Sequence, residues 1–352
     1  MTKLTTKQQK IIALIIEKGE IQSSAVRGEM LKSGENISLV TIKRALSDLA
    51  RKKILNASGV GRSTSYTLAT TGRVFADIDA KIYCDIEPDK RYGSSRYNLD
   101  LFGQMPRDLF QNEELKALYK ATAIYGQRTK DLSATLQKKE LERLIIELSW
   151  KSSKIEGNTY TLLDTEKLIL ENKEAVGHSK SEAAMILNHK DAFNFIVENI
   201  KIFTELNRTN LEKLHAILVK DLGVSIELRK SPVGIVGSKY RPLDNVYQIQ
   251  DAVEALAVAI KKTRSPYAKA LLAVLGISYI QPFEDGNKRT GRLMANALLL
   301  AHKLAPLSYR NVDEADYRAA MIVFYELNSI IPFKKIFINQ YEFAAGNYAV
   351  KL

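Results

Sequence analysis

The sequence predicts a mainly α-helical protein that begins with a small α+β domain, and three observations carry this prediction. Apolar residues recur at helical spacing in nearly every segment from residue 113 to residue 352. The first seventy residues instead combine three short helical patterns with two β-type segments around a glycine-rich stretch. The composition, 45% hydrophobic and 26% charged over 352 residues, is typical of a globular protein long enough for two or three domains.

The N-terminal domain, residues 1–70, is expected to form three helices and then a hairpin. Gly19 ends the first helical pattern, and Ser38 is a favourable N-cap for the third. The predicted helices cover residues 6–18, 23–31 (or 24–31) and 39–52. The two predicted strands cover residues 54–57 and 65–68, with a glycine-rich tip at 59–64.

The third predicted helix has an apolar face and a polar face. The apolar residues expected to be buried are Val40, Ile42, Leu46 and Leu49. The residues left for solvent or a partner are Thr41, Lys43, Arg44 and Ser47. Residues 1–70 hold twelve Lys/Arg and five Asp/Glu, a net charge of +7 out of +12 for the whole chain. This asymmetry indicates a polyanionic partner for the N-terminal domain.

Three helices followed by a hairpin with a basic tip resemble a winged helix-turn-helix domain. In that family the third helix enters the major groove of DNA, and the wing contacts the backbone or the minor groove. The resemblance therefore implies that DNA is contacted by Thr41, Lys43, Arg44 and Arg62. The alternative is a winged helix that serves only protein contacts or dimerisation.

Residues 71–112 are expected to be a connector with some short structure of its own, because glycines, prolines and polar residues interrupt the apolar pattern. The remaining domain, residues 113–352, is expected to be all-α. Its predicted helices cover residues 115–124, 136–156, 162–172, 179–198, 209–222, 249–263, 266–280, 287–304 and 314–327. The exception is the segment 229–242, which is rich in glycine and β-branched residues and is expected to form a short β-hairpin flap.

Residues 281–292 form the most informative stretch, and they read Gln-Pro-Phe-Glu-Asp-Gly-Asn-Lys-Arg-Thr-Gly-Arg. A turn of this kind between two apolar helices is suited to phosphate. Gly286 allows the backbone to approach an anion, and the first N–H groups of the following helix point toward it. Asp285 can hold a divalent cation, while two arginines three residues apart can clamp phosphoryl oxygens.

This stretch resembles the signature of the Fic family, which runs His-x-Phe-x-acid-Gly-Asn-Gly-Arg-x-x-Arg. The resemblance implies a protein adenylyltransferase that transfers AMP from ATP to a hydroxyl of a target protein. It implies that Asp285 holds Mg²⁺ and that Asn287 orients the phosphate. The residues implied to bind the nucleotide are Phe283, Gly286, Asn287, Lys288, Arg289, Gly291 and Arg292. In this scheme Arg289 pairs with phosphate oxygens and Arg292 holds the γ-phosphate, while the flap docks the main chain of the target as an added strand.

A second motif, Ser152-Ser153-Lys154-Ile155-Glu156-Gly157-Asn158, is similar to the autoinhibitory pattern of the same family. Ser152 and Glu156 lie one helical turn apart, and Gly157 is a natural helix stop. The resemblance implies that Glu156 pairs with Arg292 and so takes this arginine from the γ-phosphate. The alternative is a solvated glutamate beside a helix terminus.

Two positions depart from the family signature. Gln281 stands where the catalytic His belongs, and an amide cannot accept a proton as His does, so the loss of a general base would cost about 10²–10⁴ in rate. Either a deliberate His→Gln substitution made to stop turnover or a natural variant with weak chemistry accounts for it. Lys288 stands where the last Gly belongs, as in the Doc branch of the superfamily, which transfers phosphate instead of AMP.

These departures leave two alternative functions. One is a Doc-like protein phosphotransferase, and the other is a DNA-binding regulator whose Fic body is a catalytically impaired nucleotide sensor. The implied partners are ATP and Mg²⁺, a protein hydroxyl (on Ser, Thr or Tyr, including one of its own), DNA at residues 1–70, and a second copy of the chain.

The remaining features favour a cytoplasmic protein. A single cysteine, Cys84, excludes an intramolecular disulfide, and neither a signal peptide nor a membrane span is predicted. The four histidines, His178, His189, His215 and His302, have no metal-ligand spacing and are expected to be structural or surface residues.

Overall fold

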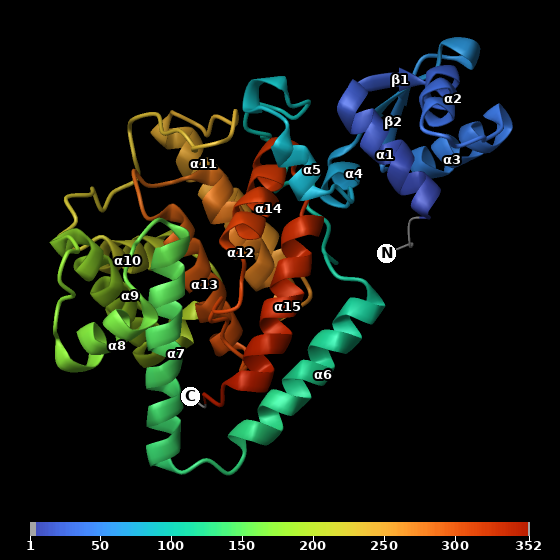
Figure 1. Cartoon of the computed structure of the whole chain (residues 1–352). Coiled ribbons are helices and arrows are strands. Elements are labelled where there is room, and N and C mark those ends of the chain that lie inside the picture. The colour runs from blue at the N-terminus through green and yellow to red at the C-terminus, as the bar shows by residue number, and fades with distance from the viewer. Residues whose placement is uncertain (1–4, 351–352) are drawn as a thin grey trace. The chain divides into compact units, whose positions relative to one another are not determined.

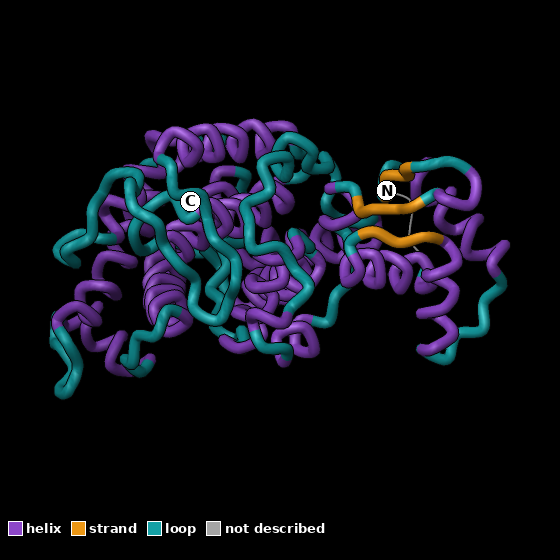
Figure 2. The backbone as a smooth tube through the Cα atoms, turned by 90° about the horizontal axis from the view of Figure 1, so that it is seen from above, coloured by secondary structure: helices purple, strands orange, loops and turns teal. Residues whose placement is uncertain are grey.

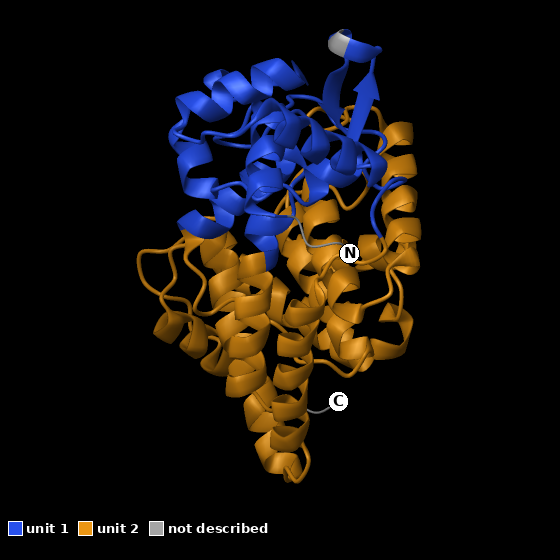
Figure 3. Ribbon diagram, turned by 90° about the vertical axis from the view of Figure 1, so that its right-hand side faces the viewer, with its two compact units in different colours: residues 1–106, 234–241, 315–334 blue, residues 107–233, 242–314, 335–352 orange. Residues whose placement is uncertain are grey.

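The computed structural model describes residues 5–350, and helices dominate it. The chain divides into two compact units (Figure 3). Unit 1 comprises residues 1–106, 234–241 and 315–334, and unit 2 comprises residues 107–233, 242–314 and 335–352. The mainly helical fold class predicted from the sequence is confirmed.

Unit 1 begins with three helices, α1 (Thr6–Lys18), α2 (Ser23–Lys32) and α3 (Leu39–Arg51). They begin and end within one residue of the predicted positions. Ser38 caps α3 as expected, since its hydroxyl accepts a hydrogen bond from the Thr41 N–H at 3.2 Å. Gly19 ends α1 with a φ of 78°, a conformation that favours glycine.

The strands of the described residues form one small antiparallel sheet in the order β1-β3-β2 (Figure 2). β2 (Leu55–Ser58) and β3 (Ser65–Leu68) are the predicted hairpin, and a 3₁₀ turn, η1 (Gly61–Ser63), lies at its tip. β1 (Glu20–Gln22) was not predicted from the sequence. It has only three residues, of which only Ile21 is buried, so it offers no periodicity to recognise.

One prediction for α3 is wrong. Ile42, Leu46 and Leu49 are fully buried, but the Val40 side chain is 60% exposed. Val40 lies two residues before Ile42, which turns its side chain about 200° away from the buried face. The buried stripe of α3 therefore begins at Ile42.

Residues 70–106 belong to unit 1 and contain α4 (Thr70–Val74), α5 (Ala80–Asp85) and the 3₁₀ turn η2 (Pro88–Lys90). A distant helix, α14 (Glu314–Leu327), adds Val323 and Leu327 to the same hydrophobic core. Its Glu326 is buried and accepts hydrogen bonds from the Tyr83 hydroxyl at 2.6 Å and the Ser238 hydroxyl at 2.7 Å. Segments far apart in sequence thus build this unit.

Unit 2 is a helical body (Figure 1). Its helices are α6 (Asn112–Thr129), α7 (Ala134–Ile155), α8 (Leu162–Glu171), α9 (Lys180–Glu198), α10 (Arg208–Leu218), α11 (Val246–Lys262), α12 (Pro266–Ile280), α13 (Asn287–Ala301) and, from Lys335, α15 (Ile331–Asn347), with the 3₁₀ turn η3 (Ile200–Phe203). α12 and α13 pack extensively against each other, and α13 also contacts α7, α9 and α10.

α13 is polar at its N-terminus yet buried there except at Lys288. α12 is apolar and buried on nearly all sides, with Lys269 half-buried. Gly291 of α13 permits the close approach of these two helices, because a Cβ there would lie 3.1 Å from the Val274 carbonyl oxygen. This packing places the loop between α12 and α13 on a rigid base.

The expected β-hairpin flap at 229–242 is absent, since the described residues of this segment form no paired strands of their own. The β-branched residues have no opposite strand to pack on, and Val236 is 99% exposed. Some backbone carbonyls of the segment accept hydrogen bonds from arginine side chains instead. Arg229 donates to the Ser231 carbonyl at 2.8 Å, and within unit 1 Arg91 donates to the Gly237 carbonyl at 2.8 Å.

None of the helices between residues 5 and 350 combines the length and the apolar character that a membrane crossing requires.

Candidate functional site

The α12–α13 loop is built around two residues with left-handed backbone conformations. Gln281 ends α12 with φ 51° and ψ 59°, and Gly286 precedes α13 with φ 78° and ψ −1°. Gly286 is required for a second reason, because a Cβ there would lie 3.2 Å from Val219. The first turn of α13 contains no acidic residue and no side-chain cap, so its N–H groups remain suited to an anion.

The side chain of Asn287 stabilises the loop through internal hydrogen bonds. Its Oδ1 accepts a hydrogen bond from the Phe283 N–H at 2.8 Å, and its Nδ2 donates to the Phe283 carbonyl at 2.8 Å. Nδ2 also donates to Oε1 of Gln281 at 3.0 Å. Any influence of the Asn287 side chain on a phosphate would therefore be exerted through the shape of the loop.

Gln281, which stands where the resemblance implies a His, is buried, with 8% of its surface exposed. Its Oε1 accepts from Asn287, and its Nε2 donates to the Ser278 carbonyl at 2.7 Å. Both ends of the amide are engaged, and an amide has no useful proton affinity near neutral pH. The side chain supports the loop and offers no base.

Two residues at the site were not identified from the sequence. His215 of α10 stacks on Phe283 with ring centroids 3.6 Å apart, and its Nε2 donates to the Asp285 carbonyl at 3.0 Å. Burial lowers the pKa of His215 to about 4, so the ring is neutral at pH 7. The side chain of Arg229 donates from Nε to the Gln281 carbonyl at 2.6 Å, and its backbone N–H donates to the Pro282 carbonyl at 3.0 Å. Their sequence neighbourhoods contain no spacing that signals these contacts.

Arg289 is a buried cation with an unused donor. Its Nη2 pairs with Oδ2 of Asp285 at 3.0 Å. Its Nη1 is buried and makes no hydrogen bond with the part of the chain that the structure describes. Burial lowers the pKa of Arg289, although the neighbouring carboxylates oppose this effect. A buried guanidinium N–H without an acceptor is costly, and a phosphate oxygen would satisfy it.

Arg292 is fully buried, and the end of α7 engages its guanidinium. Nε donates to the Ser152 hydroxyl at 2.9 Å, and Nη2 donates to the Ser152 carbonyl at 2.8 Å. Nη1 lies 2.9 Å from Oε1 of Glu156. The structure thus brings together Ser152, Glu156 and Arg292, the three residues that the resemblance had connected.

Glu156 is the C-cap of α7 and is followed by Gly157, whose φ is 100°. Its second oxygen, Oε2, lies 3.3 Å from Nζ of Lys288. Burial opposes ionisation of this carboxyl, but the two cations, Arg292 above all, lower the pKa of Glu156 below its ordinary value. The carboxylate is therefore ionised at neutral pH and bound by two residues of α13.

Asp285 has the position and exposure of a cation ligand, since 65% of its side chain is accessible. Within residues 5–350 no group of three or more His, Cys, Asp or Glu residues surrounds a common point suitable for a metal ion. Mg²⁺ is commonly held by one or two carboxylates together with substrate phosphates. A single exposed aspartate beside a helix N-terminus that is suited to an anion fits that pattern.

The residues expected to contact DNA lie on α3 and at the hairpin tip. Lys43 and Arg44 are exposed, and Thr41 is half-buried with its hydroxyl 2.9 Å from that of Ser38. Arg62 belongs to η1, and its side chain lies outside the described residues.

Comparison with known proteins identifies the surrounding domain. Residues 205–299 match the family model described as the Fic/DOC family. A protein adenylyltransferase Fic of Nematostella vectensis is 28% identical over 198 residues, which cover 51% of this chain and 43% of that protein. A protein adenylyltransferase fic-1 of Caenorhabditis elegans is 23% identical over 199 residues, which cover 55% and 39%. The matched region spans about two fifths of the length of these two relatives.

Solved structures show the same fold. Fic-1 (residues 134–508) of C. elegans superimposes with a TM-score of 0.57 at 18% identity, covering 67% of this chain and 72% of that one. A Fic family protein from Desulfovibrio desulfuricans G20 superimposes with a TM-score of 0.56 at 21% identity, covering 68% and 75%. The loop, the buried arginines and the helix that ends at Glu156 therefore belong to a helical body with the Fic fold.

Proposed function

We propose that this chain, which carries a Fic/DOC family domain, is a protein adenylyltransferase held in an inhibited state by Glu156. In the reaction, a hydroxyl oxygen of the target protein forms a bond to the α-phosphorus of ATP. The bond from that phosphorus to the oxygen of the β-phosphate breaks, and pyrophosphate leaves. The names of the relatives support this reaction, and the observation that carries it is the unused, buried Nη1 of Arg289 beside the open N-terminus of α13.

The chain's own groups would act mainly by positioning and charge neutralisation, which dominate phosphoryl chemistry. The N–H groups after Gly286 would hold phosphate oxygens, and Arg289 would donate its free N–H to one of them. Asp285 would hold Mg²⁺, whose charge would offset part of the phosphate charge. His215 and Arg229 would act as positioning residues, because both bind carbonyl groups of the loop and neither would touch the nucleotide.

Inhibition would follow from competition for Arg292. A γ-phosphate needs the guanidinium that Ser152 and Glu156 occupy. ATP would then bind with its phosphates displaced from the productive position. Removing the Glu156 carboxylate would release its contact with Nη1 of Arg292, so that a phosphate oxygen could take its place.

Gln281 sets an upper limit on turnover. The proton of the attacking hydroxyl would have to pass to water or to a phosphate oxygen, because the Gln281 amide is hydrogen-bonded at both ends and is not basic. A His at this position would serve as general base and raise the rate by about 10²–10⁴.

We further propose that residues 1–70 are a winged helix-turn-helix domain that binds DNA. The support is the element order α1-β1-α2-α3-β2-β3, the sheet order β1-β3-β2 and the net charge of +7 in this segment. Such a domain would direct the enzyme to a DNA site.

The decisive experiment is intact-mass analysis of a Gln281→His, Glu156→Gly double variant, alone and with a protein extract, after incubation with Mg²⁺ and ATP. Addition of AMP would support the adenylyltransferase. Addition of phosphate would replace it with the Doc-like reaction that Lys288 suggests. Nucleotide binding without any transfer would instead favour a nucleotide-sensing regulator.

A further inference from the structure

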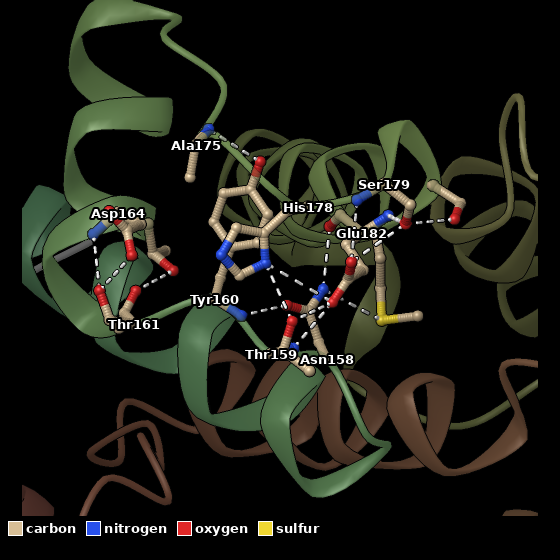
Figure 4. A network of polar contacts seen from close by, with 12 residues as sticks. Asn158, Thr159, Tyr160, Thr161, Asp164, Ala175, His178, Ser179 and Glu182 are labelled. Atoms are coloured by element: carbon tan, nitrogen blue, oxygen red, sulfur yellow. Dashed lines mark hydrogen bonds and ion pairs between the residues drawn. The ribbon is translucent and has the colours of Figure 1, made fainter.

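A polar network follows directly after the inhibitory glutamate. Asn158 and Thr159 follow the end of α7 and contact the N-terminus of α9, while Thr161 caps α8 (Figure 4). Figure 4 shows the Glu182 carboxylate between Thr159 and Ser179. Its Oε1 accepts from the Thr159 N–H at 2.9 Å and from the Thr159 hydroxyl at 2.6 Å. Its Oε2 accepts from the Ser179 N–H at 3.0 Å and from the Ser179 hydroxyl at 3.1 Å.

Glu182 therefore has two separate tasks. Toward Ser179 it completes the capping box of its own helix, α9. Toward Thr159 it ties down a different segment, the one that follows Glu156. The hydrogen bonds from Thr159 and Ser179 lower the pKa of Glu182 to about 2, so the carboxylate is ionised at neutral pH.

A second tie joins the same segment to both helices. Nδ2 of Asn158 donates to the backbone carbonyl of Glu182 at 2.9 Å, and the Asn158 N–H donates to the Ser153 carbonyl in the last turn of α7 at 3.1 Å. Trp150 of α7 donates from Nε1 to the carbonyl of buried Tyr160 at 3.2 Å. The end of α7 is thus connected to α9 by contacts on residues 158–160.

Gly157 separates these ties from Glu156. Its φ of 100° is accessible mainly to glycine, and no atom lies within 4 Å of the position that a Cβ would take. Its backbone N–H donates to the Lys154 carbonyl at 3.0 Å, so Gly157 closes the end of α7. The direction of the Glu156 side chain therefore depends on how firmly the chain is held on either side of Gly157.

We infer that Glu182 is a positioning residue for the inhibitory contact: by holding Thr159 on α9, it keeps Glu156 in place against Arg292. The regulatory meaning of this inference rests on the proposed function, but the contact itself does not. Loss of the Glu182 carboxylate would let the segment swing about Gly157 and weaken the hold of Glu156 on Arg292. A γ-phosphate would then compete more successfully for the guanidinium.

The test compares Glu182→Ala with two matched variants. Ser179→Ala removes the N-cap of α9 but leaves the Thr159 contact. Asp164→Ala removes a carboxylate that accepts a hydrogen bond from the hydroxyl of Thr161, the N-cap of α8. Calorimetry measures the affinity of each full-length variant for ATP and for ADP, which lacks the γ-phosphate. Hydrogen exchange measures the protection of the amides of residues 153–158.

We expect Glu182→Ala to bind ATP about tenfold more tightly than the unmodified chain does, with ADP affinity unchanged, since about 1.4 kcal/mol of competition is lost. Exchange at 153–158 should accelerate in this variant and not in the two controls. Glu182→Gln should largely restore the original behaviour, because an amide oxygen can still accept from Thr159.

If Glu182→Ala and Ser179→Ala have equal ATP affinity and equal hydrogen exchange at residues 153–158, the inference is overturned. The role of Glu182 would then be fully explained by capping of α9. If Glu182→Ala fails to fold, Thr159→Val tests the same tie without touching the α9 cap. If no variant binds nucleotide, the proposed function fails, while the exchange experiment still decides whether Glu182 holds the end of α7.

Discussion

Oε1 of Glu156 lies 2.9 Å from Nη1 of the fully buried Arg292, and this ion pair joins the end of α7 to α13. A buried pair of this kind is strongly destabilised when only one partner is removed. Arg292 therefore needs another anion whenever Glu156 leaves. Under the proposed function a phosphate group of ATP would satisfy that need, and inhibition and substrate binding would be alternative ways to neutralise one buried charge.

The first prediction concerns the competition between Glu156 and phosphate for Arg292. In a Gln281→His background, Glu156→Gln should raise the initial rate of AMP transfer about tenfold to hundredfold, because a hydrogen bond to a charged group contributes about 1.5–3 kcal/mol. Incorporation of labelled AMP measures the rate. Glu166→Gln, on an exposed position of α8, is the matched control. An equal rate in Glu156→Gln and its parent would exclude an inhibitory role for the carboxylate.

The second prediction concerns Lys288, which the structure pairs with Glu156 at 3.3 Å. The pair is partly exposed, with 31% of the Lys288 side chain accessible, and partly exposed pairs contribute little. Lys288→Ala should therefore tighten ATP binding by no more than about fivefold, since such a pair contributes about 1 kcal/mol at most. Calorimetry measures the change against Lys262→Ala at the exposed end of α11. Weaker ATP binding in Lys288→Ala would instead identify this lysine as a phosphate ligand.

Much of this arrangement could be predicted from local signals. The caps and glycines placed α1 and α3 within one residue, whereas α7 begins earlier than predicted, at Ala134, and α13 ends earlier than predicted, at Ala301. The spacing of Ser152, Glu156 and Gly157 indicated that they would act together. The contacts of His215 and Arg229 could not be predicted, because they depend on residues far away in sequence. The hairpin predicted at residues 229–242 is absent for a related reason. A β-branched segment forms a strand only where a partner strand exists, and Val236 has none.

The third prediction concerns the shape of the loop. Gly286→Ala combines an unfavourable φ of 78° with a contact of 3.2 Å to Val219. It should destabilise the protein by about 1–2 kcal/mol and weaken ATP binding at least tenfold. Gly177→Ala has a similar φ of 86° in open space, so it should cost stability without affecting the nucleotide. Chemical denaturation and calorimetry measure the two effects, and equal loss of binding in both variants would contradict the explanation.

The fourth prediction concerns the pH dependence of stability. His215 has a pKa of about 4 in the folded protein and about 6.5 when unfolded, so the unfolded state takes up the proton first as the pH falls. Its contribution to stability is complete above pH 6.5 and declines between pH 6.5 and pH 4. Between pH 7 and pH 5 the unmodified chain should lose about 2 kcal/mol more stability than His215→Gln.

Urea denaturation at the two pH values measures this difference, and buried His189 contributes equally to both proteins. The same experiment with His302→Gln is the control, because that ring lies at the other end of α13. Identical pH dependence in His215→Gln and the unmodified chain would show that His215 is not the group responsible.

The fifth prediction concerns the N-terminal domain. If α3 lies in a DNA groove, its exposed cations neutralise phosphates and release counterions. Arg44→Ala and Lys43→Ala should each weaken binding to duplex DNA and reduce the slope of log K against log salt by about 1. Lys32→Ala, an exposed lysine at the end of α2, should change the slope by less. Fluorescence anisotropy with labelled duplexes over a range of salt concentrations measures the slopes. Equal slopes for all three variants would mean that the +7 charge attracts DNA without orienting α3 on it, and the helix would then be available for protein contacts instead.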